Sequence, residues 1–513
     1  MATLAMSMNG LPIRAFGEGK FLNALAKSRN TNGNILVLVR LSGGNDGLNT
    51  IIPLDRYAEL TAARSNVLIP QNDVLPLTGT TTTGLHPYMT GLQSMYDDGL
   101  VNIVQGVSYP NPSLSHFRST DIVYTGSDSN QFQDTGWVGR YIDNEFPGAP
   151  QAYPDPDFLS PLAIQIGSTV STMLAGANGI NGLAVSSVSN FYNIVTGQVD
   201  PAPNTPAGHE LSFIRYIAQQ TQAYTQVLQQ AASQGTNLAT YPTGNRLAAQ
   251  LKIVAQLVSG GLETPVFVVE QGGYDTHDNQ VDSSNQSNGQ HAALLGQLSD
   301  AIAAFQEDLK LLGKDDIVTG CTFSEFGRRI RSNASNGTDH GVGAPMIVFG
   351  KQVNPTIIGT SPVLPANATN NDHVPMQHDF RQVYSTILQD WFDISPSDTA
   401  NILNGNTHST LPIFKGPTSV ENVDDIAKNV SLEQNFPNPV VDHTTIRFTS
   451  SGGAVQITLY DMNGRRVREI YQNQLPPGTF DIDFNRESLP AGTYIYEFVQ
   501  GSQKIAKQMI IAG

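Results

Sequence analysis

The chain has almost no cysteine and few basic residues. Cys321 is its single cysteine, so no disulfide can form within the chain and cysteine spacing says nothing about the compartment. Because Cys321 lies inside an apolar stretch that predicts a strand, we expect a buried, unreactive thiol. The 28 lysines and arginines are outnumbered by 44 acidic residues, giving a net charge of -16. A chain without a basic stripe is not expected to bind nucleic acid.

Long apolar runs are also missing. No stretch approaches the roughly 18 apolar residues of a membrane-spanning helix, so no transmembrane segment is predicted. The 39% hydrophobic and 14% charged residues are typical of a folded protein, and 513 residues predict at least two domains. Residues 1–34 lack the positive start of a secretory signal, and polar and proline residues interrupt their apolar part. Whether they are the remnant of a longer leader stays open.

Residues 35–415 alternate between apolar runs and helical periodicity. Runs at 35–41, 100–107, 162–166, 265–270, 316–323 and 344–350 predict buried strands, and periodic segments at 209–233, 245–258, 290–312 and 378–393 predict helices. Leu294, Leu298, Ile302, Phe305 and Leu309 recur at helical spacing and predict one apolar stripe. This order predicts an α/β domain with a doubly wound, mostly parallel sheet.

The pattern changes after residue 415. Residues 416–431 are polar and aperiodic and predict a linker. Residues 432–513 form short alternating segments separated by turn signals at 463–464, 476–478 and 490–492. Alternation of period two predicts half-buried antiparallel strands, and about 80 such residues predict a small all-β, immunoglobulin-like sandwich.

Four short polar clusters follow apolar runs: SGGNDG (42–47), GGYDTHDNQ (272–280), SEFGRR (324–329) and GTDHG (337–341). In open α/β sheets, ligands bind outside the carboxyl ends of the strands, so these clusters are expected to converge on one crevice. They contain carboxylates and imidazoles, which bind metals or move protons. An enzyme is therefore the first hypothesis.

The segments LEQNFPNPVVDHTTIRF (432–448), ITLYDMNGRRV (457–467) and LPAGTYIYEFVQGSQKIAKQMII (489–511) occur in order. They resemble the type A C-terminal sorting domain of the bacterial type IX secretion system. The resemblance implies passage through the periplasm and export, by the type IX machinery, to the outer cell surface or the extracellular space of a Bacteroidetes-type bacterium. The alternative is a generic carbohydrate-binding or spacer sandwich.

A second resemblance covers residues 35–400. ILVLVRLSGGNDGLNTIIP (35–53), GWVGRYID (136–143), YDTHDNQ (274–280), SEFGRR and GTDHG are similar to a secreted, sulfatase-like family of unknown function in the alkaline phosphatase superfamily. The resemblance implies a site for a divalent metal, with calcium, zinc and magnesium all open. Its expected ligands are Asn45, Asp46, Asp275, His277, Glu325, Asp339 and His340. The Asp-x-His spacing at 275–277 and Glu325 depart from the superfamily pattern, so one ion is easier to build than two.

The nucleophile is assigned from position alone. Ser115 follows a predicted strand and precedes a helix, where the resemblance implies a nucleophile, while the formylglycine motif of sulfatases is absent. His116 is a candidate base, and Arg328 a candidate cation that grips sulfate or phosphate. Each has a structural alternative: Ser115 as a helix N-cap, His116 as a packing residue and Arg328 as an ion-pair partner of Glu325.

Two functions remain open. The first is a metal-assisted hydrolase of sulfate or phosphate esters, acting on a polysaccharide or a small ester. The second is a non-catalytic surface protein that keeps the fold for adhesion or assembly. No nucleotide cofactor is implied.

Overall fold

The structure is a computed structural model, and it describes residues 6–8, 11–13, 33–147, 158–177, 179–185, 205, 224–415, 431–462, 465–500 and 503–512. Contacts within the chain divide it into two units, Met1–Lys415 and Gly416–Gly513. Each is described by itself. The predicted linker lies outside the described residues except for its last position. In the N-terminal segment, β1 (Met6–Met8) pairs with β2 (Leu11–Ile13).

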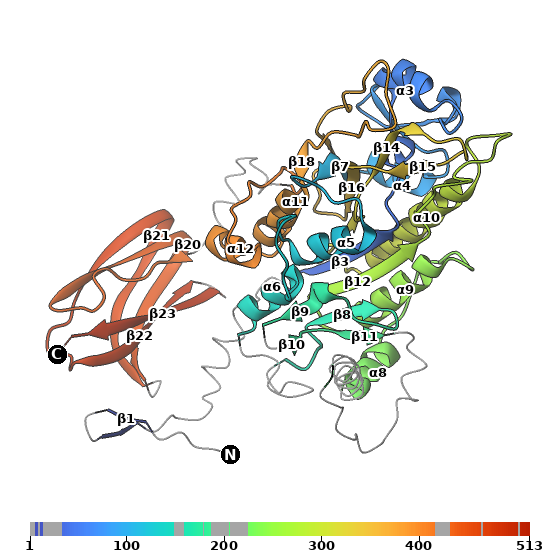
Figure 1. Ribbon diagram of the computed structural model, residues 1–513. Helices are drawn as coiled ribbons and strands as arrows, with labels where there is room; N and C mark the ends of the chain where they lie inside the picture. Colours follow the sequence, from blue (N-terminus) through green and yellow to red (C-terminus); the bar gives the residue numbers. More distant parts are fainter. Residues whose placement is uncertain are drawn as a thin grey trace. The chain divides into compact units, whose positions relative to one another are not determined.

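The first unit is built on a nine-stranded sheet (Figure 1). Along its main path the order is β11 (Leu183–Val185), β8 (Ala163–Ile166), β12 (Val266–Gly272), β3 (Ile35–Ser42), β13 (Val318–Phe323), β16 (Ala344–Phe349), β7 (Val101–Ser108) and β17 (Ile357–Ile358), and β18 (His378–Asp379) also pairs with β7. Only β16 runs antiparallel to its neighbours within this sheet as described. The predicted doubly wound, mostly parallel sheet is confirmed.

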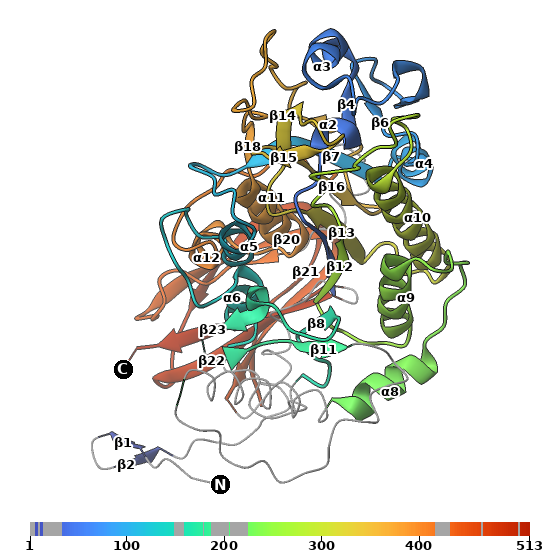
Figure 2. The same cartoon turned by 45° about the vertical axis from the view of Figure 1, so that its right-hand side comes forward.

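Helices cover both faces of this sheet (Figure 2). One group consists of α4 (Thr90–Asp97), α8 (Thr225–Gln234), α9 (Arg246–Ser259) and α10 (Gln290–Leu311); the other of α5 (His116–Thr125), α6 (Trp137–Glu145), α11 (Phe380–Thr386) and α12 (Pro396–Ile402). Val37 and Val39 of β3 belong to the core under the first group, and Leu36 and Leu38 to the core under the second. The continuous apolar run thus reflects a strand buried on both faces.

Smaller elements surround the sheet. A short sheet joins β4 (Ile51–Pro53), β6 (Thr83–Leu85) and β5 (Leu75–Pro76); hairpins join β9 (Ala175–Gly176) with β10 (Gly179–Ile180) and β14 (Arg328–Ser332) with β15 (Thr338–His340); and two short helices are α2 (Gly47–Thr50) and α3 (Tyr57–Arg64). Of the helix predicted over 209–233, residues 209–223 lie outside the described part, and the remainder is α8. A π-helical turn, Ile387–Trp391, continues α11 through most of the helix predicted over 378–393.

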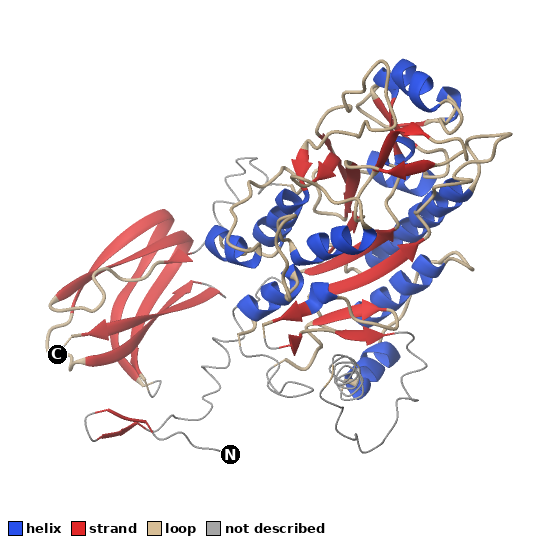
Figure 3. Cartoon of the chain, in the orientation of Figure 1, coloured by secondary structure: helices blue, strands red, loops and turns tan. Residues whose placement is uncertain are grey.

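The regular elements of the second unit are strands wherever its residues are described (Figure 3), and they pair antiparallel. They are β19 (Ser431–Leu432), β20 (His443–Asp461), β21 (Arg466–Asn485), β22 (Gly492–Gln500) and β23 (Gln503–Ile511). The predicted small β-sandwich is confirmed, with one correction. The turn signal at 476–478 does not end a strand, because β21 runs through it.

Membrane-spanning helices were searched for among the described residues, and none there has the length and apolar character to cross a bilayer.

Candidate metal centre

The four polar clusters lie together beyond the carboxyl ends of β3, β12 and β13, as predicted. Gly43 and Gly44 allow this approach. Both have positive φ, and a Cβ on Gly43 would lie 2.3 Å from the backbone nitrogen of Asp275, while one on Gly44 would lie 2.4 Å from the Phe326 ring. Only glycine accepts both the conformation and the space. These two residues therefore let the end of β3 contact the loops after β12 and β13.

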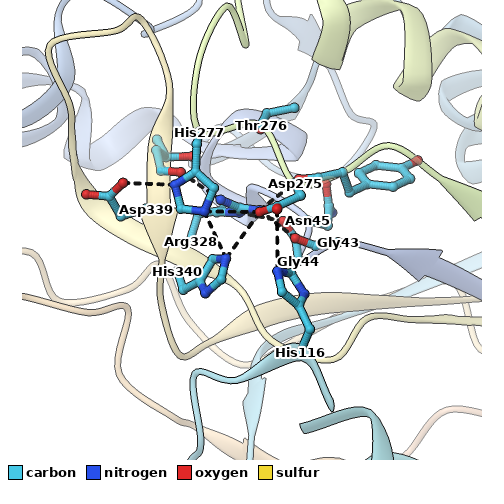
Figure 4. A network of polar contacts seen from close by, with 12 residues as sticks. Gly43, Gly44, Asn45, His116, Asp275, Thr276, His277, Arg328, Asp339 and His340 are labelled. Carbon is cyan, nitrogen blue, oxygen red and sulfur yellow. Dashed lines mark hydrogen bonds and ion pairs between the residues drawn. The ribbon is translucent and has the colours of Figure 1, made fainter. Parts of the chain in front are cut away.

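Three histidines surround the carboxylate of Asp275. His277 and His340 each place Nε2 at 3.1 Å from its Oδ1, and these two nitrogens are 2.9 Å apart. His116 Nε2 lies 3.5 Å from Oδ2. Figure 4 shows the three imidazoles directed toward this carboxylate. One ligand atom each from His116, Asp275 and His340 all lie within 4.8 Å of one another, close enough for one metal ion to join them, and His277 lies beside two of them.

Each imidazole is also held on the side away from Asp275, where its Nδ1 meets an acceptor. The Nδ1 atom of His116 lies 2.9 Å from Glu325 Oε1, and that of His277 lies 3.0 Å from Asp339 Oδ1. The Nδ1 atom of His340 lies 2.9 Å from the carbonyl oxygen of Leu114. A carbonyl can only accept, so His340 donates through Nδ1–H and its neutral ring has a lone pair on Nε2. Metal-binding histidines are commonly oriented in this way by carboxylates and carbonyls.

The charge of Asp275 is held by Arg328. Burial raises the pKa of Asp275, but the hydrogen bond and positive charge of Arg328, with the neighbouring histidines, outweigh burial and lower this pKa to about 2. The carboxylate is therefore ionised at neutral pH. Burial is the main cause that lowers the pKa of His340, which favours the neutral imidazole that a metal requires. An anionic oxygen and neutral imidazole nitrogens are a donor set that fits a divalent cation.

Arg328 is not placed to grip a substrate. It is 1% exposed, and its three nitrogens all donate to protein acceptors. The acceptors are the carbonyls of Gly43, Gly44, Tyr274 and Thr338 and the carboxylate of Asp275. The suggested pairing of Arg328 with Glu325 is not observed either. Arg328 instead fixes the backbone of three loops and one oxygen of Asp275.

The side chains of Asn45 and Asp46 contact residues other than the three histidines. Both are 1% exposed. The two oxygens of Asp46 accept from the Arg64 guanidinium, and one also accepts from Gln280 at 2.6 Å. The Asn45 side-chain oxygen lies 3.0 Å from His291 Nε2. Burial raises the pKa of Asp46, but Arg64 and His291 outweigh it and hold this pKa below its usual value. The carboxylate expected to bind metal is thus engaged in a buried ion pair.

Glu325 and Asp339 are placed behind the histidines. Glu325 is 3% exposed, and its Oε1 also accepts from the backbone N–H of Gly43 at 2.8 Å. Asp339 Oδ1 accepts from Asn333 at 3.2 Å as well as facing His277. Both carboxylates were expected as ligands, and their contacts are instead those of residues that orient His116 and His277.

Ser115 occupies the N-cap position of α5, but its hydroxyl makes no capping bond. The residue is exposed. Its neighbours on both sides contact the centre, since the Leu114 carbonyl holds His340 and His116 faces Asp275. The N-cap alternative for the hydroxyl is therefore not observed.

Two contributors were not singled out from the sequence. The Phe326 ring lies 4.9 Å from the His116 ring and 4.5 Å from the His340 ring, and Leu114 contributes only a backbone carbonyl. Such a carbonyl carries no sequence signal. The position of His116 could be inferred from the sequence. It begins the helix that follows β7, another strand of the same sheet, so it was expected near the strand ends.

Two family models match the chain. Residues 210–396 match the family described as "Protein of unknown function (DUF1501)", and residues 434–512 match the "Secretion system C-terminal sorting domain". These are the two families that the sequence motifs resemble. The sorting domain indicates secretion to the cell surface or the extracellular space. No curated protein matches the chain.

Several solved structures match the chain at low sequence identity. A protein in the alkaline phosphatase superfamily from Vibrio parahaemolyticus is 9% identical, with 90% of this chain and 91% of that chain covered and a TM-score of 0.34. The PsFucS1 sulfatase from Pseudoalteromonas sp. is 10% identical, with 93% and 89% covered and a TM-score of 0.32. Alkaline phosphatase from the Antarctic bacterium TAB5 is 10% identical, with 73% and 99% covered and a TM-score of 0.29.

Proposed function

We propose that the protein is an exported, metal-dependent hydrolase of sulfate or phosphate esters. The observation that carries the proposal is the arrangement of His116, His277 and His340, whose Nε2 atoms converge on Asp275 while each Nδ1 faces an acceptor. A purely structural ion-pair cluster does not require three imidazoles to be oriented in this same way.

The donor set favours zinc. Zinc binds imidazole nitrogen and carboxylate oxygen in tetrahedral geometry, whereas calcium takes six to eight oxygen ligands and magnesium demands octahedral, largely oxygen coordination. His116, Asp275, His277 and His340 would be the ligands, and the ester would bind as a fifth, since catalytic zinc can become five-coordinate. Three of these side chains are between about a third and a half exposed, at 34% for His116, 42% for His277 and 47% for Asp275, so an ester can reach the centre from solvent.

Ser115 is the proposed nucleophile. A zinc ion bound here would lower the pKa of a nearby hydroxyl and screen the anionic ester. The Ser115 hydroxyl is free to attack because the helix does not use it as a cap. The first N–H groups of α5 stabilise negative charge at this helix end. His116 serves as a ligand in this proposal, and Arg328 positions Asp275, so neither acts as predicted from the sequence.

Export completes the proposal. The sorting domain would direct the protein through the type IX machinery after it enters the periplasm, and the hydrolase would act at the outer surface or after release. Its acidic charge of -16 suits an exterior rich in divalent cations.

The test uses the full chain, stripped with a chelator and reloaded with zinc. We expect retention of one zinc and hydrolysis of an aryl sulfate or aryl phosphate. His340→Ala should lose both properties, Ser115→Ala should keep zinc and lose hydrolysis, and His443→Ala, an exposed histidine of the C-terminal unit, should change neither. If the wild type retains no zinc, manganese, calcium or magnesium and cleaves no aryl ester, the result favours the non-catalytic surface protein.

A further inference from the structure

A cavity of about 790 Å³ lies beside the candidate metal centre. It is bounded by the ends of β8 and β12, the start of α9 and residue Gln297 of α10. Gly272, the last residue of β12, lines the cavity, and Asp275 follows three residues later. Three residues span at most roughly 10 Å, so the cavity and the centre lie at the same end of the sheet and close together.

The polar lining of this cavity consists mainly of amides and hydroxyls. Four glutamines and two hydroxyl residues line it, with one arginine and one glutamate: Gln165, Gln250, Gln271, Gln297, Ser168, Thr169, Arg246 and Glu270. The glutamate is already paired, because Arg40 lies 3.4 Å from it. Amides and hydroxyls both donate and accept hydrogen bonds. The lining therefore suits a ligand whose groups also do both.

Several of these groups are free to bind. Gln165 is 8% exposed, and its oxygen accepts from the Ser171 N–H at 2.8 Å, so the side chain is fixed while its Nε2 bonds to no described residue. Gln297 and Arg246 make no side-chain hydrogen bond or ion pair within the described part of the chain. These free groups come from β8, α9 and α10 and face one space. Gln165 favours binding because its orientation is set before the ligand arrives, whereas no described partner fixes the side chains of Gln297 and Arg246.

The remaining lining narrows the class of ligand. Ile166, Leu247 and Ile253 supply apolar surface, and no aromatic ring lines the cavity among the described residues. The volume falls in the usual range of about 300 to 1,000 Å³ for small-ligand sites. A flat aromatic ligand would lack a stacking partner, and a multiply charged one would lack counter-charges.

We propose that this cavity binds the sugar rings of an oligosaccharide, whose hydroxyls pair with Gln165, Gln297, Arg246, Ser168 and Thr169 and whose C–H faces contact the isoleucines and the leucine. We further infer that the bound sugar is the part of the substrate next to the scissile ester, and this step rests on the proposed hydrolase function. Sugar binding itself does not, because none of the cavity residues is a proposed metal ligand.

Binding is tested with the metal-stripped full chain on an array of short sulfated and unsulfated oligosaccharides, followed by calorimetry with the tightest member. Gln297→Ala and Arg246→Ala should each raise its Kd about 2- to 12-fold, the range expected for one lost hydrogen bond. Gln226→Ala, an exposed glutamine of α8 outside the cavity, is the matched control and should leave Kd unchanged. Gln297 and Arg246 are exposed, so the variants Gln297→Ala and Arg246→Ala are expected to fold.

Two results would overturn the proposal: no oligosaccharide binds at millimolar concentration, or binding survives in the double variant Gln297→Ala with Arg246→Ala as in the control. Its failure is separable from failure of the hydrolase function. If the protein retains zinc and cleaves a small aryl ester but binds no sugar, only the sugar-binding proposal is contradicted. If the protein binds sugar but neither retains zinc nor cleaves the ester, only the proposed hydrolase function is contradicted.

Discussion

Replacing Asp46 by asparagine should destabilise the first unit without weakening metal binding. The side chains of Asp46 and Arg64 are 1% and 0% exposed, and the guanidinium donates to both carboxylate oxygens. Asp46→Asn leaves the buried charge of Arg64 without its counter-charge. Removing one partner of a buried ion pair costs about 3–5 kcal/mol. With an m-value of about 3 kcal/mol/M, a lower bound for a unit of this size, the urea midpoint falls by at most roughly 1 to 1.7 M.

Tryptophan fluorescence measures this unit selectively. The chain has 2 tryptophans, Trp137 and Trp391, and both are buried in Met1–Lys415. Urea unfolding followed by fluorescence therefore does not report the C-terminal unit. Asp300→Asn, on the exposed face of α10, is the matched control and should change stability by less than about 0.5 kcal/mol.

Zinc titration of the same variants completes the experiment. Because the Asp46 carboxylate is bonded to Arg64 and Gln280 and contacts none of the three histidines, Asp46→Asn should keep the zinc Kd within about twofold of wild type. An unchanged urea midpoint together with a tenfold or greater rise in zinc Kd would refute this reasoning, since Asp46 would then be a ligand, as the sequence suggested.

Other predictions follow from the neighbouring contacts. Asp339→Asn removes the carboxylate behind His277 and should raise the zinc Kd about 10- to 100-fold. Asp278 is the exposed residue after His277, and Asp278→Asn should leave the zinc Kd unchanged. An equal rise in both variants would contradict an orienting role for Asp339. Burial lowers the pKa of His291 to about 4, against about 6.5 when unfolded, so between these values only the unfolded chain binds the proton. Stability of the first unit should therefore be complete above about pH 6.5 and fall toward pH 4, less steeply in His291→Gln; the same slope in both proteins would contradict a buried neutral imidazole.

The strands and the location of the site were predictable because they depend on patterns local in sequence. The run at 35–41 is apolar on both faces of a strand, and the stripe from Leu294 to Leu309 has helical period, so both could be read directly. Convergence of the clusters followed from the rule that ligands bind beyond parallel strand ends.

The proposed division between ligands and supporting residues was not predictable. Arg64 lies 18 residues from Asp46, on a short helix, and nothing in the local sequence indicates that they pair. Whether a carboxylate faces a metal or the back of an imidazole depends on side-chain direction, which residue type does not specify. Glu325 and Asp339 were accordingly expected as ligands, and His116 as a base.

The central claim is that His116, Asp275, His277 and His340 bind one zinc ion. A crystal of zinc-loaded protein, measured at the zinc absorption edge, would test this directly through the anomalous difference map. We predict one strong peak about 2.0 to 2.2 Å from the Nε2 atoms of the three histidines and from an oxygen of Asp275. A map with no peak there, or with His277 and His340 joined to Asp275 and no ion between them, would contradict it.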